Sequence, residues 1–118
     1  MKRTELLELG LRLRSLMYLD GIVKKHRYRF STFKDCFIGK DAVIWCVNNE
    51  QVKQSTKKDA TRLLDDLLTA GCLHHVKREH SFKDAYLFYR WSSENDIQNL
   101  LKHSINCGGE ALELSAST

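Results

Sequence analysis

The stretch Leu67-Leu-Thr-Ala-Gly-Cys-Leu-His-His-Val76 takes the chain from a helix directly into a strand. This helix is expected to begin at Ser55 or Thr56, either of which can cap it, and to end at Gly71, a typical residue just beyond a helix. Its apolar residues recur at helical spacing, at Ala60, Leu63, Leu64, Leu67 and Leu68. We expect a strand at 72–76 to pair antiparallel with 86–91 across a polar turn.

Three further helices are predicted on either side of this unit, at 4–21, at about 40–48, and from residue 92 or 93 onward. The apolar face of the first helix comprises Leu6, Leu9, Leu13, Leu16 and Met17. That of the last helix comprises Ile97, Leu100, Leu101 and Ile105. Gly10 inside the first helix costs about 1 kcal/mol relative to alanine. We expect these two faces to pack together.

Between the first two helices, residues 28–33 (Tyr-Arg-Phe-Ser-Thr-Phe) are strand-like, and their Ser-Thr pair is expected to turn a short hairpin. Trp45 on the second helix is predicted to be buried against the third helix, at Leu63, Leu64 and Leu67. The other aromatic residues that we place in the core are Phe37, Phe82, Phe88 and Tyr89. The order helix, hairpin, helix, helix and two-stranded wing is that of a winged helix, which is an α+β fold.

The composition indicates one globular domain. The chain has 118 residues, 42% of them hydrophobic and 29% charged, and a chain of this size buries roughly two-thirds of its unfolded surface. It is too apolar for a disordered chain. The longest charge-free apolar run, 42–47, is far shorter than the ~20 residues of a membrane-spanning helix. The N-terminal leucines are interrupted by Glu8, Arg12 and Arg14, so we expect no signal peptide.

The cysteines lack the paired spacing of a metal site or a disulfide framework, standing at Cys36, Cys46, Cys72 and Cys107. We interpret the first three as small buried apolar residues and Cys107 as a loose thiol. This usage favours a reducing compartment.

Positive charge is concentrated in one stretch of the chain. The net charge is +4, but residues 24–40 contain six basic residues and one aspartate, a local +5 that leaves the remainder at −1. The basic residues are Lys24, Lys25, Arg27, Arg29, Lys34 and Lys40. Such a concentration is either an ordinary solvated surface or a patch that attracts an anionic partner.

Three stretches in the right order give the chain from about residue 21 to residue 91 a resemblance to a DEP domain, the module named after Dishevelled, Egl-10 and pleckstrin. The first is the basic run 25–40, which leads into Cys36-Phe-Ile-Gly39, and the second is Asp41-Ala-Val-Ile-Trp-Cys-Val47. The third is 67–76 together with Phe82-Lys-Asp84 and Leu87-Phe-Tyr-Arg-Trp91. Cys46 stands where the family usually has leucine, and Trp91 where phenylalanine is commonest.

This resemblance implies a three-helix bundle with a protruding hairpin arm and a small antiparallel sheet, with no catalytic activity and no cofactor. Around the DEP domain at 21–91, we expect residues 1–20 to form a helix packed on it, 92–105 a C-terminal helix and 106–118 a disordered tail. Carried over by position, the arm has Lys24, Lys25, Arg27 and Arg29 on its first limb, Phe30 near its tip and Lys34 on its return. An aromatic residue at such a tip either faces outward or folds back on the core.

Two functions stay open. In one, the basic arm docks on anionic membrane lipid, because DEP domains resemble one another in placing signalling proteins at membranes. In the other, the module docks on a membrane protein or on a regulator of G-protein or small-GTPase signalling, with no direct lipid contact. Both would place the chain at the cytoplasmic face of a membrane, as a recruited protein or as the soluble domain of a multi-pass membrane protein. In isolation we expect a monomer.

Nucleic-acid and metal binding are disfavoured by the charges and the spacing. The third helix, which would read DNA in a winged helix, has Lys57, Lys58 and Arg62 balanced by Asp59, Asp65 and Asp66. A zinc site could be built from Cys72, His74, His75 and His80, but alternation along a strand separates His75 from the first two. No motif of a catalytic nucleophile, paired carboxylates or phosphate-binding glycines is present.

Overall fold

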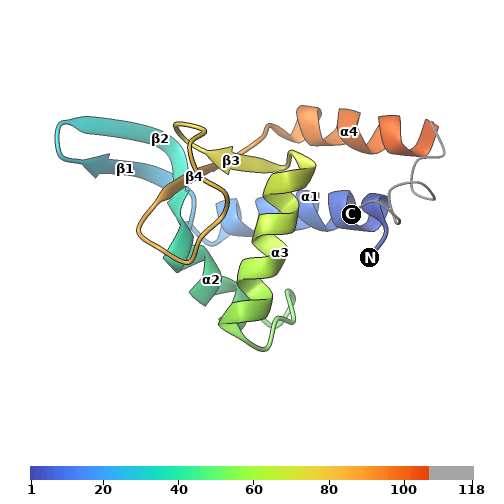
Figure 1. Ribbon diagram of the computed structural model, residues 1–118, viewed down its shortest axis with the longest axis horizontal. Helices are drawn as coiled ribbons and strands as arrows, with labels where there is room; N and C mark the ends of the chain where they lie inside the picture. The colour runs from blue at the N-terminus through green and yellow to red at the C-terminus, as the bar shows by residue number, and fades with distance from the viewer. Residues whose placement is uncertain (107–118) are drawn as a thin grey trace.

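The computed structural model describes residues 1–106, in which four helices lie to one side of a small antiparallel sheet whose first hairpin projects beyond them (Figure 1). The elements are α1 (Arg3–Leu19), β1 (Lys24–Tyr28), β2 (Ser31–Ile38), α2 (Gly39–Asn48), α3 (Lys57–Ala70), β3 (Leu73–His75), β4 (Phe88–Trp91) and α4 (Glu94–Asn106). The strand order is β1-β2-β4-β3. The predicted α+β fold is confirmed. The expectations for Cys107 and for a tail beyond residue 106 lie outside the described residues. Over residues 1–106, no helix is both long and apolar enough to span a membrane.

The junction of α3 with β3 follows the expected pattern. The Thr56 hydroxyl oxygen accepts a hydrogen bond from the Asp59 backbone N–H at 3.0 Å, which caps α3. Gly71 ends the helix with φ of 96°, a left-handed conformation that glycine adopts without strain. β3 then pairs antiparallel with β4, which begins at Phe88, two residues later than expected. The preceding residues bond the start of α2 instead, because the backbone N–H of Gly39 donates to the carbonyl of Leu87 at 2.8 Å.

Trp45 is buried in the main core, as predicted, with 8% of its surface exposed. It shares one apolar cluster with α3 residues Leu63, Leu64 and Leu67. Its indole N–H also donates to Asp20 Oδ2 at 2.8 Å, which ties α2 to the end of α1. The aromatic residues assigned to the core from the sequence are all buried, at Phe37, Phe82, Phe88 and Tyr89. Cys36, Cys46 and Cys72 are buried free thiols.

The buried face of α1 differs in part from the one expected, although Leu13 and Met17 are fully buried, as predicted. Its fully buried leucines are Leu7 and Leu13, whereas Leu6, Leu9 and Leu16 are only partly buried. The helix presents apolar residues around much of its circumference, so spacing alone did not identify the inner face. The inner face is the one that contains Gly10, where a Cβ atom would lie 2.9 Å from Cys72 Sγ and 3.1 Å from Leu67 Cδ2. Glycine is therefore needed for the close approach of α1 to α3.

Helix α4 packs antiparallel on α1, as expected, and Ile97 is fully buried there (Figure 1). The Arg14 Nε–H donates to the Ser92 carbonyl at 3.0 Å, and the Arg3 Nε–H donates to Ser104 Oγ at 3.1 Å. The expectation for Ile105 was wrong, because 55% of its surface is exposed. At this end of α4 the buried residue is Ser104, whose hydroxyl accepts the hydrogen bond from Arg3 in the first turn of α1.

The hairpin turns at Arg29-Phe30, so the expectation of a turn at Ser31-Thr32 was wrong. Tyr28 pairs with Ser31 in the β1–β2 ladder, which leaves only two residues for the turn. Arg29 adopts φ of 57° to make it. The strands are also longer than expected. Most of their residues are exposed, so alternation of apolar residues does not mark the ends of the strands.

Candidate functional site

The β1–β2 hairpin, which we call the arm (residues 24–38), projects away from the helices (Figure 1). One face of it packs on an aromatic cluster. Phe33 lies 5.3 Å from Phe88, Tyr28 lies 6.0 Å from both Phe88 and Tyr86, and His26 lies 5.7 Å from Phe88, all between ring centroids. Aromatic pairs of this kind contribute about 0.5–1.5 kcal/mol beyond the area that they bury. The arm is therefore braced on one side only.

The opposite face of the arm presents the basic side chains. Successive residues of a strand point to opposite faces, and His26, Tyr28 and Phe33 point to the aromatic cluster. Lys25 and Arg27 of β1, and Thr32 and Lys34 of β2, therefore share the open face. Arg27 and Thr32 are direct cross-strand partners. We call these four residues the open face of the arm; all of them are exposed.

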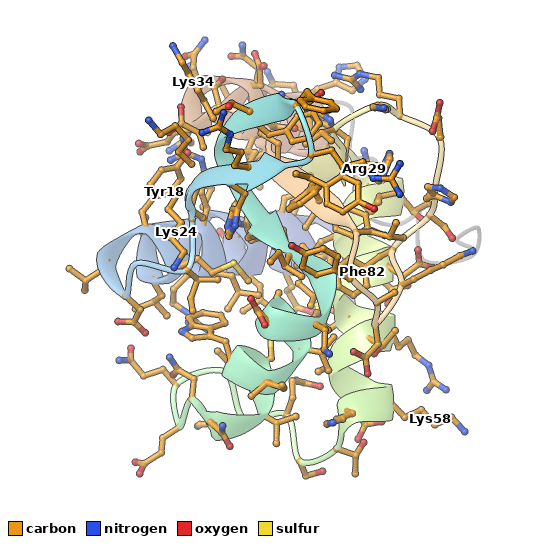
Figure 2. The ribbon with its side chains drawn as sticks, turned by 90° about the vertical axis from the view of Figure 1, so that its left-hand side faces the viewer. Tyr18, Lys24, Arg29, Lys34, Lys58 and Phe82 are labelled. Atoms are coloured by element: carbon orange, nitrogen blue, oxygen red, sulfur yellow. The ribbon has the colours of Figure 1, made fainter. Side chains whose placement is uncertain are left out.

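The base of the arm is irregular and adds further cations. The pairing shifts between Lys24 and His26, and Asp35 on the other strand has φ of 50°. Arg90 of β4 holds β2 in place, with Nε and Nη2 donating to the Lys34 carbonyl at 3.1 and 2.9 Å. Figure 2 shows Lys24 and Lys34 on the same side of the arm, with Tyr18 of α1 beside Lys24.

Arg29 and Phe30 at the tip behave differently from the rest. The Arg29 guanidinium lies 5.1 Å from the centroid of the Tyr28 ring, a cation–π contact on the braced side. In Figure 2 it lies on the other side of the arm from Lys24 and Lys34. Phe30 is 102% exposed, so it faces outward and does not fold back on the core. The six candidate residues thus share one hairpin but not one face.

His26 does not add to the positive charge of the arm at neutral pH. Burial, together with the nearby Lys24 ammonium, lowers the pKa of His26 below the ordinary value of 6.5. Its Nε2 atom is buried and has no hydrogen-bond partner within residues 1–106. The charge of the arm therefore resides in its lysines and arginines, and Asp35 is the single acidic residue among residues 24–40.

Comparison with known families identifies the module. The model of the family described as "Domain found in Dishevelled, Egl-10, and Pleckstrin (DEP)" matches residues 22–91, which span the arm, α2, α3 and the β3–β4 wing. The chain belongs to the DEP family. DEP domains are non-catalytic interaction modules of signalling proteins.

This DEP domain is similar to a small part of several much longer proteins. It is 32% identical over 68 residues to the vacuolar membrane-associated protein IML1 of Coccidioides immitis, covering 58% of this chain and 4% of that protein. It is 26% identical over 106 residues to the human phosphatidylinositol 3,4,5-trisphosphate-dependent Rac exchanger 2 protein, covering 83% of this chain and 6% of that protein. The similarity to the mouse Rac exchanger 1 protein is 30% over 71 residues, covering 60% and 4%.

A second basic set in the DEP domain lies on α3, away from the arm. Lys57, Lys58 and Arg62 line a groove of about 440 Å³ together with Asp65 and Asp84. Figure 2 shows Lys58 far from the labelled residues of the arm. Acidic side chains are interspersed with the basic ones in this groove, which makes it a natural comparison site for the open face of the arm.

The histidines of the wing are arranged around a turn. His75 is buried, and its Nδ1 accepts hydrogen bonds from the backbone N–H groups of Lys77 and Glu79 at 3.2 and 3.3 Å. His80 packs edge-on against its ring at 4.7 Å between centroids. Over residues 1–106, no three His, Cys, Asp or Glu side chains are grouped so that they could hold a metal ion.

Proposed function

We propose that this DEP domain docks the protein that contains it on anionic membranes, with the arm as the contact surface, at the cytoplasmic face of a membrane. The observation that supports this best is the fully exposed Phe30 at the tip of a hairpin whose open face carries Lys25, Arg27 and Lys34. Cationic side chains attract an anionic surface, and an exposed aromatic ring can enter the interface between headgroups and acyl chains.

The strength of such docking is limited by the number of charges. Each basic residue close to an anionic surface contributes about 1 kcal/mol at most, so the arm offers roughly 3–5 kcal/mol. That free energy corresponds to dissociation constants of about 1 mM. The arm is thus suited to a reversible contact that a second contact elsewhere in the protein can reinforce, because linked sites multiply their effects.

The geometry of the arm allows two ways of docking that single substitutions can separate. Strands rise about 3.4 Å per residue, so Lys24 is about 14 Å from the end of β1, which is more than the ~10 Å screening length at 0.1 M salt. In a tip-first contact, Phe30, Arg29 and Arg27 meet the membrane and Lys24 contributes little. In a side-on contact, Lys25, Arg27 and Lys34 meet it together. Phe30 at the tip favours the first.

The names of similar proteins agree with a role at membranes. IML1 is named as vacuolar membrane-associated, and the Rac exchangers are named as dependent on a phosphatidylinositol trisphosphate. The word "Rac exchanger" also supports the second candidate, in which the module binds a regulator of small-GTPase signalling or a membrane protein without touching lipid. These two candidates predict opposite responses to salt.

The test is sedimentation with vesicles of phosphatidylserine and phosphatidylcholine. The unmodified chain should bind, and raising the salt from about 0.1 M to about 1 M should abolish binding, because screening shortens the range of the attraction. Reversal of Lys24, Lys25, Arg27 and Arg29 to Glu changes the local charge from +5 to −3 and should abolish binding. The matched control reverses Lys57, Lys58 and Arg62 on α3 and should bind as the unmodified chain does.

Several outcomes contradict lipid docking by the arm. If the α3 control loses binding while the arm variant retains it, the site is on α3. If vesicles do not bind at low salt, while a purified regulator or membrane protein binds in a way that tolerates salt, the protein-interaction candidate is correct. Single variants then separate the two orientations: Arg29→Glu should weaken binding more than Lys34→Glu in a tip-first contact, and the order should reverse in a side-on contact.

A further inference from the structure

A hydroxyl group lies among the basic side chains of the arm. In the sequence Arg27-Tyr-Arg-Phe-Ser-Thr-Phe33, arginines precede Thr32 by five and three residues, and an aromatic residue follows it. Protein kinases distinguish substrates by the pattern of charge around the modified hydroxyl. Kinases with acidic substrate grooves bind arginines at these two positions, because carboxylates accept paired hydrogen bonds from a guanidinium. Thr32 has the sequence context that such kinases select.

The structure makes Thr32 accessible. It is exposed on the open face of the arm, and neither its hydroxyl nor that of Ser31 is hydrogen-bonded to another part of residues 1–106. A kinase binds its substrate as an extended chain, so the tip of the hairpin must open first. Opening must separate the cross-strand pairs Tyr28–Ser31, Arg27–Thr32 and His26–Phe33, next to a two-residue turn. It must also lift Phe33 off Phe88. The ends of structural elements open at small free-energy cost.

We propose that Thr32 is a phosphorylation site for an arginine-directed protein kinase, and that its phosphate releases the arm from anionic membranes. The release rests on the proposed function, whereas the modification does not. The phosphate would be placed on the same face as Lys25, Arg27 and Lys34, at a position directly paired with Arg27.

The chemistry is a transfer of the γ-phosphoryl group of ATP. Thr32 Oγ1 attacks the γ-phosphorus and forms a new P–O bond, while the bond from that phosphorus to the β,γ-bridging oxygen breaks. ADP leaves with the electron pair of the broken bond, and the hydroxyl proton passes to the catalytic carboxylate of the kinase. The arm contributes the nucleophile and the two arginines that orient it.

Phosphate opposes membrane docking in two ways. It adds a charge of about −1.5 to −2 at neutral pH, which lowers the local +5 of residues 24–40 to about +3. Its oxygens can also pair with the guanidinium of Arg27 across the ladder, which withdraws that group from the membrane. With each basic group worth about a factor of five at most, the loss of two should weaken vesicle binding roughly tenfold and by no more than about 30-fold.

The first experiment tests the modification. The 118-residue chain is incubated with magnesium-ATP and a purified arginine-directed kinase, and the phosphate is located by peptide mass spectrometry. Phosphate should appear on Thr32, should be absent in Thr32→Val, and should persist in Ser31→Ala. Arg29→Lys should slow the reaction, because lysine keeps the charge but cannot form the paired hydrogen bonds. Phosphate on Ser31 in place of Thr32, or none on the folded chain, would overturn the proposal.

The second experiment tests the release, with the phosphorylated and unmodified chains compared on phosphatidylserine vesicles. Phosphorylated chain should bind roughly tenfold more weakly, and circular dichroism should show that its fold is retained. Equal binding of the two forms overturns the release. If the unmodified chain fails to bind at all, the proposed function is wrong and the release with it, while the mapped phosphate still decides whether Thr32 is a modification site.

Discussion

The helical body and the arm of this domain are stabilised in different ways. In the body, α1, α3 and α4 meet through side chains with no exposed surface, such as Leu7, Leu67 and Ile97. In the arm, every lysine and arginine is exposed, and one face alone is braced by aromatic contacts. The space available in the core therefore restricts which side chains the body can accommodate. Charge and exposure to water restrict which side chains the arm can accommodate.

This difference separates stability from binding. A substitution in the body removes packed contacts, and the interior is too dense to rearrange without cost. A substitution on the open face of the arm removes a charge that contacts mainly water, and such changes usually alter stability by less than about 0.5 kcal/mol. Substitutions in the body should therefore act by lowering the free energy of unfolding. Substitutions on the arm should leave the fold intact and lower the affinity for the membrane.

The largest effect is expected for Trp45→Ala in the body. Trp45 is 8% exposed and belongs to the main core. Removing a buried aromatic side chain costs about 3–5 kcal/mol, which is a large share of the stability of a small domain. The free energy of unfolding from urea denaturation measures it. A loss below about 1 kcal/mol would show that the body is far less tightly packed than its exposure values indicate.

Trp45→Phe serves as the control that separates packing from hydrogen bonding. It keeps an aromatic ring but deletes the N–H that donates to Asp20 Oδ2. Asp20 is exposed, so water can replace the lost donor, and a typical hydrogen bond contributes only about 0.5–1.5 kcal/mol net. Trp45→Phe should therefore cost much less than Trp45→Ala.

The next effect is expected within α4, where two isoleucines differ in burial. Ile97 is fully buried, whereas 55% of the surface of Ile105 is exposed. Ile97→Ala should destabilise the fold by about 2–5 kcal/mol, and Ile105→Ala by less than about 0.5 kcal/mol. Thermal melts of the two variants side by side decide it. Equal melting temperatures would mean that α4 does not dock on α1 in solution.

Local signals in the sequence predicted the elements of the body well. Thr56 and Gly71 are short-range signals for the two ends of a helix, and they act as such in the structure. The buried residues of α3 recur at helical spacing along a single apolar stripe, so Leu63, Leu64 and Leu67 were placed correctly. Both signals depend on residues a few positions apart, which a sequence displays directly.

Contacts between distant residues were harder to predict. The inner face of α1 depends on the close approach of Gly10 to Cys72, and nothing in the spacing of the leucines shows that approach. The braced face of the arm depends on Tyr86 and Phe88, which follow the arm by more than 45 residues. The identity of the arm residues was predicted through a family resemblance, but their division between two faces required the ladder register.

Gly10→Ala should show that α1 has no room for a larger residue where it approaches Cys72. In an isolated helix this change is stabilising by about 1 kcal/mol. Here the new Cβ atom would lie 2.9 Å from Cys72 Sγ, and overpacking of this kind costs about 1–3 kcal/mol. Chemical denaturation should show a net loss, and Cys72→Ala in the same chain should recover part of it through relief of the contact. A stabilised Gly10→Ala variant would contradict the close approach.

A pH effect is expected at His75 in β3, the edge strand of the sheet opposite β1. Burial lowers the pKa of His75 below the ordinary value of 6.5, and the nearby His80 lowers it further, with smaller effects from Lys77 and His74, while Glu79 raises it. Below pH 6.5 the unfolded chain then binds more protons than the folded one, so stability falls as pH falls through this range. His26 has a pKa shifted in the same direction.

His75→Asn should reduce this pH dependence while keeping an acceptor for the backbone N–H groups of Lys77 and Glu79. Urea midpoints at about pH 7.5 and pH 5.5 measure the slope, since the ordinary pKa lies between them. The variant should show a smaller difference between the two midpoints than the unmodified chain. An unchanged difference would mean that other groups, such as His26, account for the acid sensitivity.

The smallest effect on stability is expected at the tip of the arm. Phe30 is fully exposed, and Phe33, three residues later, packs on Phe88 with the rings tilted and 5.3 Å between centroids. Phe30→Ala should change the free energy of unfolding by less than about 0.5 kcal/mol, because the ring contacts water in the folded and unfolded chains alike. Phe33→Ala should cost more, since it removes a ring that braces the arm.

On phosphatidylserine vesicles the order of the two variants should reverse, and Phe30→Ala should lose the larger share of affinity. The reason is that a ring that enters the interface contributes about 1.5–3 kcal/mol when buried. If Phe30→Ala destabilises the fold as much as Phe33→Ala does, the tip packs on the body and the separation between arm and body fails.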